Sequence, residues 1–152
     1  MISFNDKSDG SIVISITAHI RPKGSGKAMI RHGTQHPIII FDPPDYRKVS
    51  DNIHKALVAA WGERPPLGGP MRYSAIYSFV KPKTSKDPYP YHVGDIDKLM
   101  RRVLDWLGGN ARSPGPVLAN DNLIVATGQH QKVWSEHDGV VIKLTPMEML
   151  RK

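Results

Sequence analysis

The stretch GDIDKLMRRVLDWLG, residues 94–108, carries the clearest structural pattern of the chain. Its apolar side chains recur at the spacing of one helix face, and they are Leu99, Met100, Val103, Leu104, Trp106 and Leu107. Gly108 and Gly109 follow at once, and glycine is the usual residue at the end of a helix. We therefore expect an amphipathic helix over residues 95–107, with this apolar face in the core.

The segments on either side predict strands and a second helix. Residues 45–61 have helical periodicity and follow Asp42-Pro43-Pro44, a capping carboxylate before prolines. Alternating or wholly apolar runs predict strands at residues 11–20, 38–41, 72–80 and 139–144, with extended structure around a turn over residues 117–134. Because strands and helices do not alternate strictly, we expect an α+β fold: one mixed β-sheet with helices packed mainly on one face.

Length and composition narrow the class of protein. A chain of 152 residues fits one domain over residues 1–152 with a sizeable core. The chain has no cysteine, which excludes disulfides, thiolate zinc sites and thiol catalysis. No apolar run approaches the roughly 20 residues that cross a bilayer, and residues 1–6 lack the features of a signal peptide. We expect a cytoplasmic protein without a membrane partner.

The charge balance favours a polyanionic partner. The formal net charge is +7 at pH 7, and basic domains bind nucleic acid because each neutralised phosphate releases counterions. Against this basic background, Asp95 and Asp97 flank Ile96 where the helix is expected to begin. Two carboxylates this close suit a hard cation such as Mg²⁺, and Asp121 is the candidate third ligand. The alternative is that the pair merely caps the helix.

Two motifs resemble those of the RusA family of Holliday-junction resolvases. DIDKL at residues 95–99 and NDNLIV at residues 120–125 are similar to that family's P-D-[LI]-D-N-L and D-D-x-[QL]-[VI]. RPKG at residues 21–24 resembles its basic loop after the first strand, and FVKPK at residues 79–83 lies where its strand enters the active-site loop. The resemblance extends from about residue 12 to residue 144, and it implies a two-layer RusA-like fold.

The resemblance implies a magnesium-dependent endonuclease that resolves four-way DNA junctions by paired nicks. The metal ligands would be Asp95, Asp97 and Asp121, and Mn²⁺ is the expected substitute for Mg²⁺. The family's catalytic lysine falls on Arg101, which cannot deliver a proton because its pKa exceeds about 12 but can stabilise charge in the transition state. Asn120 stands where the family has the first of two aspartates, so only Asp121 offers a carboxylate there.

Basic residues surround the acidic motif in the sequence and are expected to contact DNA. The predicted DNA-binding residues are Lys23, Lys27, Lys81, Lys83, Lys86, Lys98 and Arg102, with Arg31 and Arg112 as further cations. Asp105 follows Arg101 by four residues and is interpreted as its ion-pair partner in the helix.

Paired nicks need two active sites, so a twofold homodimer is expected, and the resemblance suggests a phage or prophage origin. Two alternatives stay open: a DNA-binding protein without nuclease activity, and a nuclease that prefers flaps or forks.

Overall fold

The computed structural model describes residues 1–23, 27–30, 37–40, 44–108 and 115–148. Seven strands, two α-helices and one short 3-10 helix occur in this part of the chain. In chain order they are β1 (Ile2–Asp6), β2 (Ile12–Thr17), β3 (Lys27–Ile30), β4 (Pro37–Ile40), α1 (Pro44–Trp61), β5 (Met71–Val80), α2 (Ile96–Leu107), η1 (Asp121–Leu123), β6 (Ile124–Ser135) and β7 (Gly139–Pro146).

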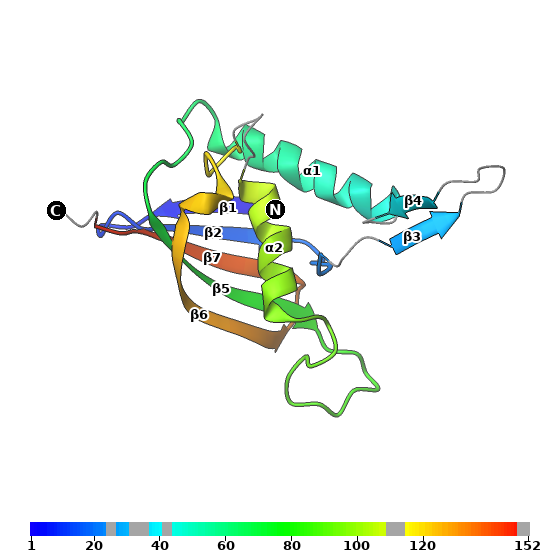
Figure 1. Cartoon of the computed structure of the whole chain (residues 1–152). Coiled ribbons are helices and arrows are strands. Elements are labelled where there is room, and N and C mark those ends of the chain that lie inside the picture. The colour runs from blue at the N-terminus through cyan, green and yellow to red at the C-terminus, as the bar shows by residue number, and fades with distance from the viewer. Residues whose placement is uncertain (24–26, 31–36, 41–43, 109–114, 149–152) are drawn as a thin grey trace.

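Five strands form one mixed sheet in the order β1-β2-β7-β5-β6. All neighbouring strands are antiparallel except β5 and β6, which run parallel. Strands β3 and β4 form a separate two-stranded sheet, seen to one side of the main sheet in Figure 1. The predicted α+β fold with one mixed sheet is confirmed, and the small second sheet is an addition to it.

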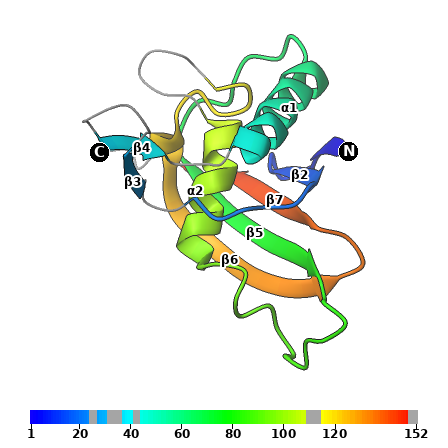
Figure 2. The same ribbon diagram turned by 90° about the vertical axis from the view of Figure 1, so that its right-hand side faces the viewer.

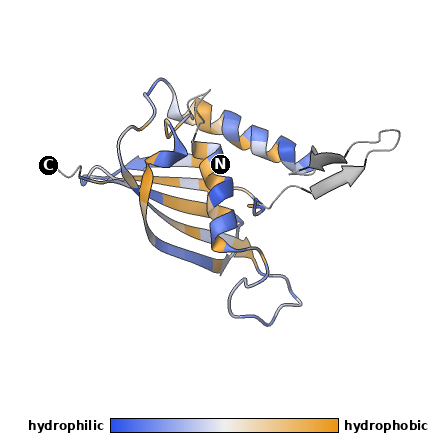
Figure 3. Ribbon diagram, in the orientation of Figure 1, coloured by the Kyte–Doolittle hydropathy of each residue, from blue (hydrophilic) through white to orange (hydrophobic). Residues whose placement is uncertain are grey.

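Both helices lie on the same side of the five-stranded sheet (Figures 1 and 2). Alternate residues of β5 are buried, as the strand's pattern of period two requires. The core between sheet and helices is made by Ile12, Ile14 and Ile16 of β2, Tyr73, Tyr77 and Phe79 of β5, Ile142 and Leu144 of β7, and Leu99, Val103, Trp106 and Leu107 of α2. The colouring by hydropathy in Figure 3 shows the corresponding apolar and polar faces of the helices.

Helix α2 begins and ends close to where the sequence predicts. Asp95 is its N-cap and Gly108 its C-cap, with the Gly108 amide donating to the Leu104 carbonyl at 2.7 Å. Gly108 has φ −99°, so it does not adopt the left-handed cap conformation. A Cβ at this position would lie 3.0 Å from the Leu104 carbonyl oxygen, so a larger residue would require the end of the helix to shift by a few tenths of an ångström. Gly109, Asp42 and Pro43 lie outside the described residues.

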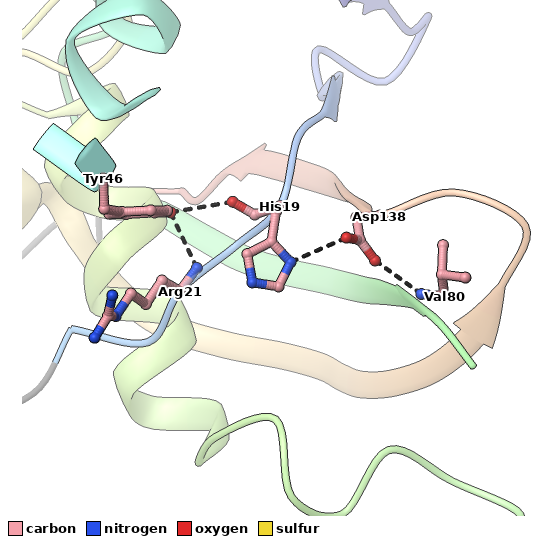
Figure 4. Close-up of polar contacts among 5 residues, drawn as sticks. All are labelled: His19, Arg21, Tyr46, Val80 and Asp138. Carbon is pink, nitrogen blue, oxygen red and sulfur yellow. Dashed lines mark hydrogen bonds and ion pairs between the residues drawn. The ribbon is translucent and has the colours of Figure 1, made fainter. Parts of the chain in front are cut away.

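A small polar network holds the segment that follows β2, residues 18–23, in place (Figure 4). The Tyr46 hydroxyl of α1 donates to the His19 carbonyl at 3.1 Å and accepts from the Arg21 amide at 3.0 Å. Asp138 pairs with His19 at 2.9 Å and accepts from the Val80 amide at 2.8 Å. The segment that leads to Lys23 is therefore tied to α1 and to the turn before β7, and the Lys23 amide then donates to the Lys98 carbonyl of α2 at 3.1 Å.

Arg102 lies in the core, which differs from the prediction that it contacts DNA. Its side chain is only 2% exposed, its Nε donates to the Arg21 carbonyl at 2.9 Å, and its guanidinium lies 4.9 Å from the centre of the Tyr46 ring. Arg102 comes three residues after Leu99 and four before Trp106, so helix geometry places it on the buried side. It holds the Arg21 segment against α2.

Replacing Arg102 with Met should lower the free energy of unfolding by about 1–2 kcal/mol. The substitution keeps the apolar stem but removes the donor to the Arg21 carbonyl and the contact with the Tyr46 ring. Urea denaturation followed by circular dichroism measures the change. The neighbouring Arg101→Met is the control and should change stability by less than about 0.5 kcal/mol, because Arg101 is exposed. Equal effects of the two substitutions would contradict a structural role for Arg102.

Candidate nuclease site

The candidate site lies at the N-terminal end of α2, where Asp95 is the N-cap residue. Its backbone is extended, and its carbonyl accepts from the Lys98 and Leu99 amides at 3.1 and 3.0 Å. Its carboxylate makes no capping hydrogen bond. The side chain is 74% exposed, and its Oδ2 lies 3.6 Å from Lys98 Nζ. Asp95 is thus the N-cap by its backbone, while its carboxylate adds no capping hydrogen bond.

Asp97 and Arg101 continue the same exposed surface. Both side chains are exposed, and Asp97 lies in the first turn of α2. Residues four apart lie above one another on a helix, so Arg101 follows Asp97 by one turn. Asp95, Asp97, Lys98 and Arg101 therefore form one mixed-charge surface at this end of α2.

Lys132 of β6, which is not among the residues predicted from the sequence, supports this end of the helix. Its Nζ donates to the Gly94 carbonyl at 3.0 Å and to the Tyr91 carbonyl at 3.4 Å. Gly94 has φ +123°, and a Cβ there would come within 2.6 Å of Pro22, so only glycine fits. The backbone that enters Asp95 is thus held from both sides. Trp134, two residues further along β6, donates from its Nε1 to the Asp87 carbonyl at 2.9 Å, and a spacing of two in an extended segment predicts that Lys132 and Trp134 lie on one face.

Asp121 lies at the opposite end of α2, which corrects the prediction that the three aspartates converge. A Cβ on Gly108, the C-cap of α2, would lie 3.3 Å from the Asp121 amide nitrogen and 3.5 Å from its Cβ. A helix of 12 residues is about 18 Å long, whereas Mg²⁺ ligands all lie about 2.1 Å from the ion. Asp121 therefore cannot share a magnesium ion with Asp95 and Asp97 of the same chain.

The remaining part of the second motif has a local structural role. The Asn120 side chain accepts from the Asn122 amide at 2.9 Å and caps η1. Asn120 is therefore the N-cap of η1. The Asp121 side chain is exposed. Among the described residues, no group of three or more histidine, aspartate or glutamate side chains is placed to hold a metal ion.

The cations predicted to bind DNA differ in their surroundings. Lys98 faces Asp95, and Lys23 forms an ion pair with Asp105. Lys81, Lys83 and Lys86 are exposed in the loop between β5 and α2, which extends from the sheet beside the start of α2 in Figures 1 and 2. Lys27 is on β3, but its side chain, Arg31 and Arg112 lie outside the described residues.

Asp105 has a structural partner, although not the one predicted. Its carboxylate pairs with Lys23 from the segment before β3 and not with Arg101 in its own helix. The pair therefore ties the 18–23 segment to α2, next to the hydrogen bond from the Lys23 amide.

We expect Asp105→Asn to lower the free energy of unfolding by well under about 1 kcal/mol, because the ion pair is partly exposed. Thermal or urea unfolding measures the loss, and a junction-cleavage assay on the same sample serves as the control. Loss of cleavage as severe as that of Asp97→Asn, in a folded protein, would place Asp105 in the site.

A cavity of about 400 Å³ lies between α1 and α2, away from the N-terminal end of α2. Its lining residues are Lys23, Arg47, Ser50, Asp51, His54, Arg102, Asp105 and Trp106, and Trp106 Nε1 donates to the Ser50 hydroxyl at 2.8 Å. The lining contains charges of both signs and none of the predicted metal ligands. It adds no ligand to the Asp95 and Asp97 pair.

A neutral aromatic cluster lies under α2. The His130 ring of β6 stacks on Tyr73 at 5.3 Å, and the Tyr73 and Tyr77 hydroxyls are 2.9 Å apart. Burial lowers the pKa of His130 and, as the largest effect, raises the pKa of Tyr77 to about 12. In the described part of the chain neither ring nitrogen of His130 has a hydrogen-bond partner. These groups are uncharged near neutral pH, so the charge near the site comes from its lysines, arginine and aspartates.

Scans of the chain against models of known protein families and against curated proteins return no match. The likeness to the RusA family therefore depends on the motif residues themselves. In the described residues, neither helix combines the length and the apolar character needed to cross a bilayer.

Proposed function

We propose that this protein is a magnesium-dependent endonuclease that resolves four-way DNA junctions by paired nicks and acts as a homodimer. The observation that carries the proposal is that the carboxylate of Asp95, the N-cap residue of α2, makes no capping hydrogen bond. Aspartate at an N-cap position normally stabilises the helix by about 1 kcal/mol through a hydrogen bond from its side chain. Here the Asp95 side chain makes no such bond and is directed into solvent beside Lys98. A residue that forgoes this stabilisation is a candidate for function.

The surroundings of Asp95 support a phosphodiester as the partner. Lys98 and Arg101 lie on α2 with the two carboxylates, and Lys81, Lys83 and Lys86 are exposed on the loop that leads into Asp95. Cations bind the phosphate backbone regardless of base sequence, and guanidinium groups stabilise developing charge on phosphoryl oxygens. Carboxylates and cations on one surface are what a nuclease needs, because the former favour a metal ion and the latter the substrate.

One observation favours a second function, DNA binding without cleavage. Within one chain only two of the three predicted ligands lie together, since Asp121 adjoins Gly108 at the far end of α2. A single chain with this geometry could bind DNA through its lysines and still lack a complete metal site.

A cleavage assay on a synthetic four-way junction separates these functions. We expect symmetric paired nicks with Mg²⁺ or Mn²⁺, and none when EDTA is present. Junction binding without nicking at any concentration of either metal would establish the second function. Faster cutting of a flap or a fork than of the junction would show a different branched substrate.

A further inference from the structure

The loop between β5 and α2 exposes two tyrosines in addition to its lysines. Tyr89 and Tyr91 are 50% and 55% exposed, whereas every other phenylalanine, tyrosine and tryptophan among the described residues is buried or half-buried. Aromatic rings contribute most to a fold when they are buried, so these two contribute little to the core. Exposed apolar groups that gather on one short segment indicate a binding surface.

The backbone of this loop is anchored to β6, so the tyrosines project from a fixed support. Trp134 Nε1 donates to the Asp87 carbonyl at 2.9 Å. Lys132 Nζ donates to the Tyr91 carbonyl at 3.4 Å, and Pro90, between the two tyrosines, is buried. A surface that is already ordered loses less entropy when a ligand binds.

The two rings are placed to receive flat ligands. Their centroids are 6.3 Å apart and their planes are tilted by 59°, so the rings of Tyr89 and Tyr91 do not stack on each other. Every nucleobase has a flat face that stacks on an aromatic side chain whatever its sequence. In a duplex these faces are covered by the neighbouring base pairs, so an unpaired base is the ligand that fits.

The charge of the loop suits the phosphates of such a strand. Residues 81–92 contain three lysines and a single carboxylate, that of Asp87, which lies 3.9 Å from Nε2 of the exposed His92. Figures 1 and 2 show the loop protruding beyond the sheet and α2, where a strand has access to it. Cations for the backbone and aromatic rings for the bases are the two components of single-strand binding.

The same loop is less suited to a membrane surface. Anionic lipids attract lysines, and tyrosine is frequent at the level of the lipid headgroups. Segments that lie in this interface also bury large apolar side chains between the acyl chains. Residues 81–92 contain no leucine, isoleucine, valine or methionine, so the composition favours nucleic acid.

We propose that Tyr89 and Tyr91 form a stacking surface for the unpaired bases of a DNA strand whose phosphates contact the lysines of the same loop. The inference rests on the proposed function only for DNA as the partner, because it involves neither a metal ion nor cleavage. It adds single-stranded or locally unpaired DNA to the ligands of the protein.

A labelled oligothymidylate and an abasic strand of the same length separate stacking from charge, because the abasic strand keeps every phosphate. We expect the wild type to bind the oligothymidylate about tenfold or more tightly than the abasic strand, measured by fluorescence anisotropy. Tyr89→Leu/Tyr91→Leu should bind the two strands equally and keep the salt dependence of the wild type, which its lysines set. Tyr89→Phe/Tyr91→Phe is the matched control: it keeps both rings and should keep the preference.

Three results would overturn the inference: no preference of the wild type for the oligothymidylate, an unchanged preference in the leucine variant, or a lost preference in the phenylalanine variant. Vesicles of phosphatidylcholine and phosphatidylserine test the other surface. Vesicle binding that the leucine substitutions weaken, without any preference for bases, would assign the tyrosines to a membrane. A wild type that prefers the oligothymidylate but cuts no junction would contradict the proposed cleavage and support the stacking surface. A wild type that cuts the junction and binds both strands equally would do the reverse.

Discussion

Replacing Asp97 or Asp95 with Asn should reduce junction cleavage by about a thousandfold or more while junction binding persists or tightens. Metal ions contribute several kcal/mol to the stabilisation of a phosphoryl transition state, and each 1.36 kcal/mol is tenfold in rate. Both side chains are exposed at the start of α2, so neither substitution should disturb the core. Removing a negative charge beside Lys98 also lessens repulsion of the DNA backbone.

Single-turnover cleavage and fluorescence anisotropy with the same labelled junction measure the two effects. Asp45→Asn is the matched control, since Asp45 is an exposed aspartate in the first turn of the other helix and should leave both measurements unchanged. Cleavage by Asp97→Asn within tenfold of the wild type would remove Asp97 from the site. Loss of binding together with cleavage would show that the substitution acts on folding or on DNA contact.

Regular patterns made most of the sheet and both helices predictable. The alternation in β5 and the 3.6-residue period of α2 extend over nine or more residues, and the observed bounds differ from the predicted ones by one residue at one end. Strand β1 was missed because five residues, ISFND, contain only two apolar side chains in alternation. Strand β3 was missed whole because its four residues, KAMI, are too few to show a period. Pairing with a neighbouring strand, which periodicity does not report, decides both.

The candidate site was predictable in its parts but not in its arrangement. Helix spacing alone predicts that Arg102 lies with Leu99 and Trp106 on the buried face. The prediction that Arg102 contacts DNA is therefore wrong for a reason that the sequence already contains. The position of Asp121 had no such signal. The 13 residues from Gly108 to Asp121 could span about 43 Å when extended, enough to return to the start of α2 or to remain at its end. Packing of η1 against Gly108 decides between these arrangements.

Binding to a four-way junction should weaken steeply with salt, because the +7 charge of each chain doubles in a dimer. If the protein neutralises roughly six phosphates, the affinity should fall by about a thousandfold between 50 and 200 mM salt. Lys81, Lys83 and Lys86 are exposed on the loop that leads into Asp95, and a loop there would meet the backbone next to the bond that is cut. These three lysines are therefore the cations expected to contribute most to the slope.

Changing Lys81, Lys83 and Lys86 together to Ala should weaken junction binding at low salt and reduce the slope of log affinity against log salt by up to about three. Binding of Mn²⁺ should not change, because none of the three is a metal ligand. Fluorescence anisotropy over a salt series gives the slope, with Lys48→Ala/Lys55→Ala on the exposed side of α1 as the control. An unchanged slope in the triple variant, or an equal loss in the control, would mean that the DNA follows another surface. The exposed lysine loop would then have no part in positioning the junction at Asp95 and Asp97.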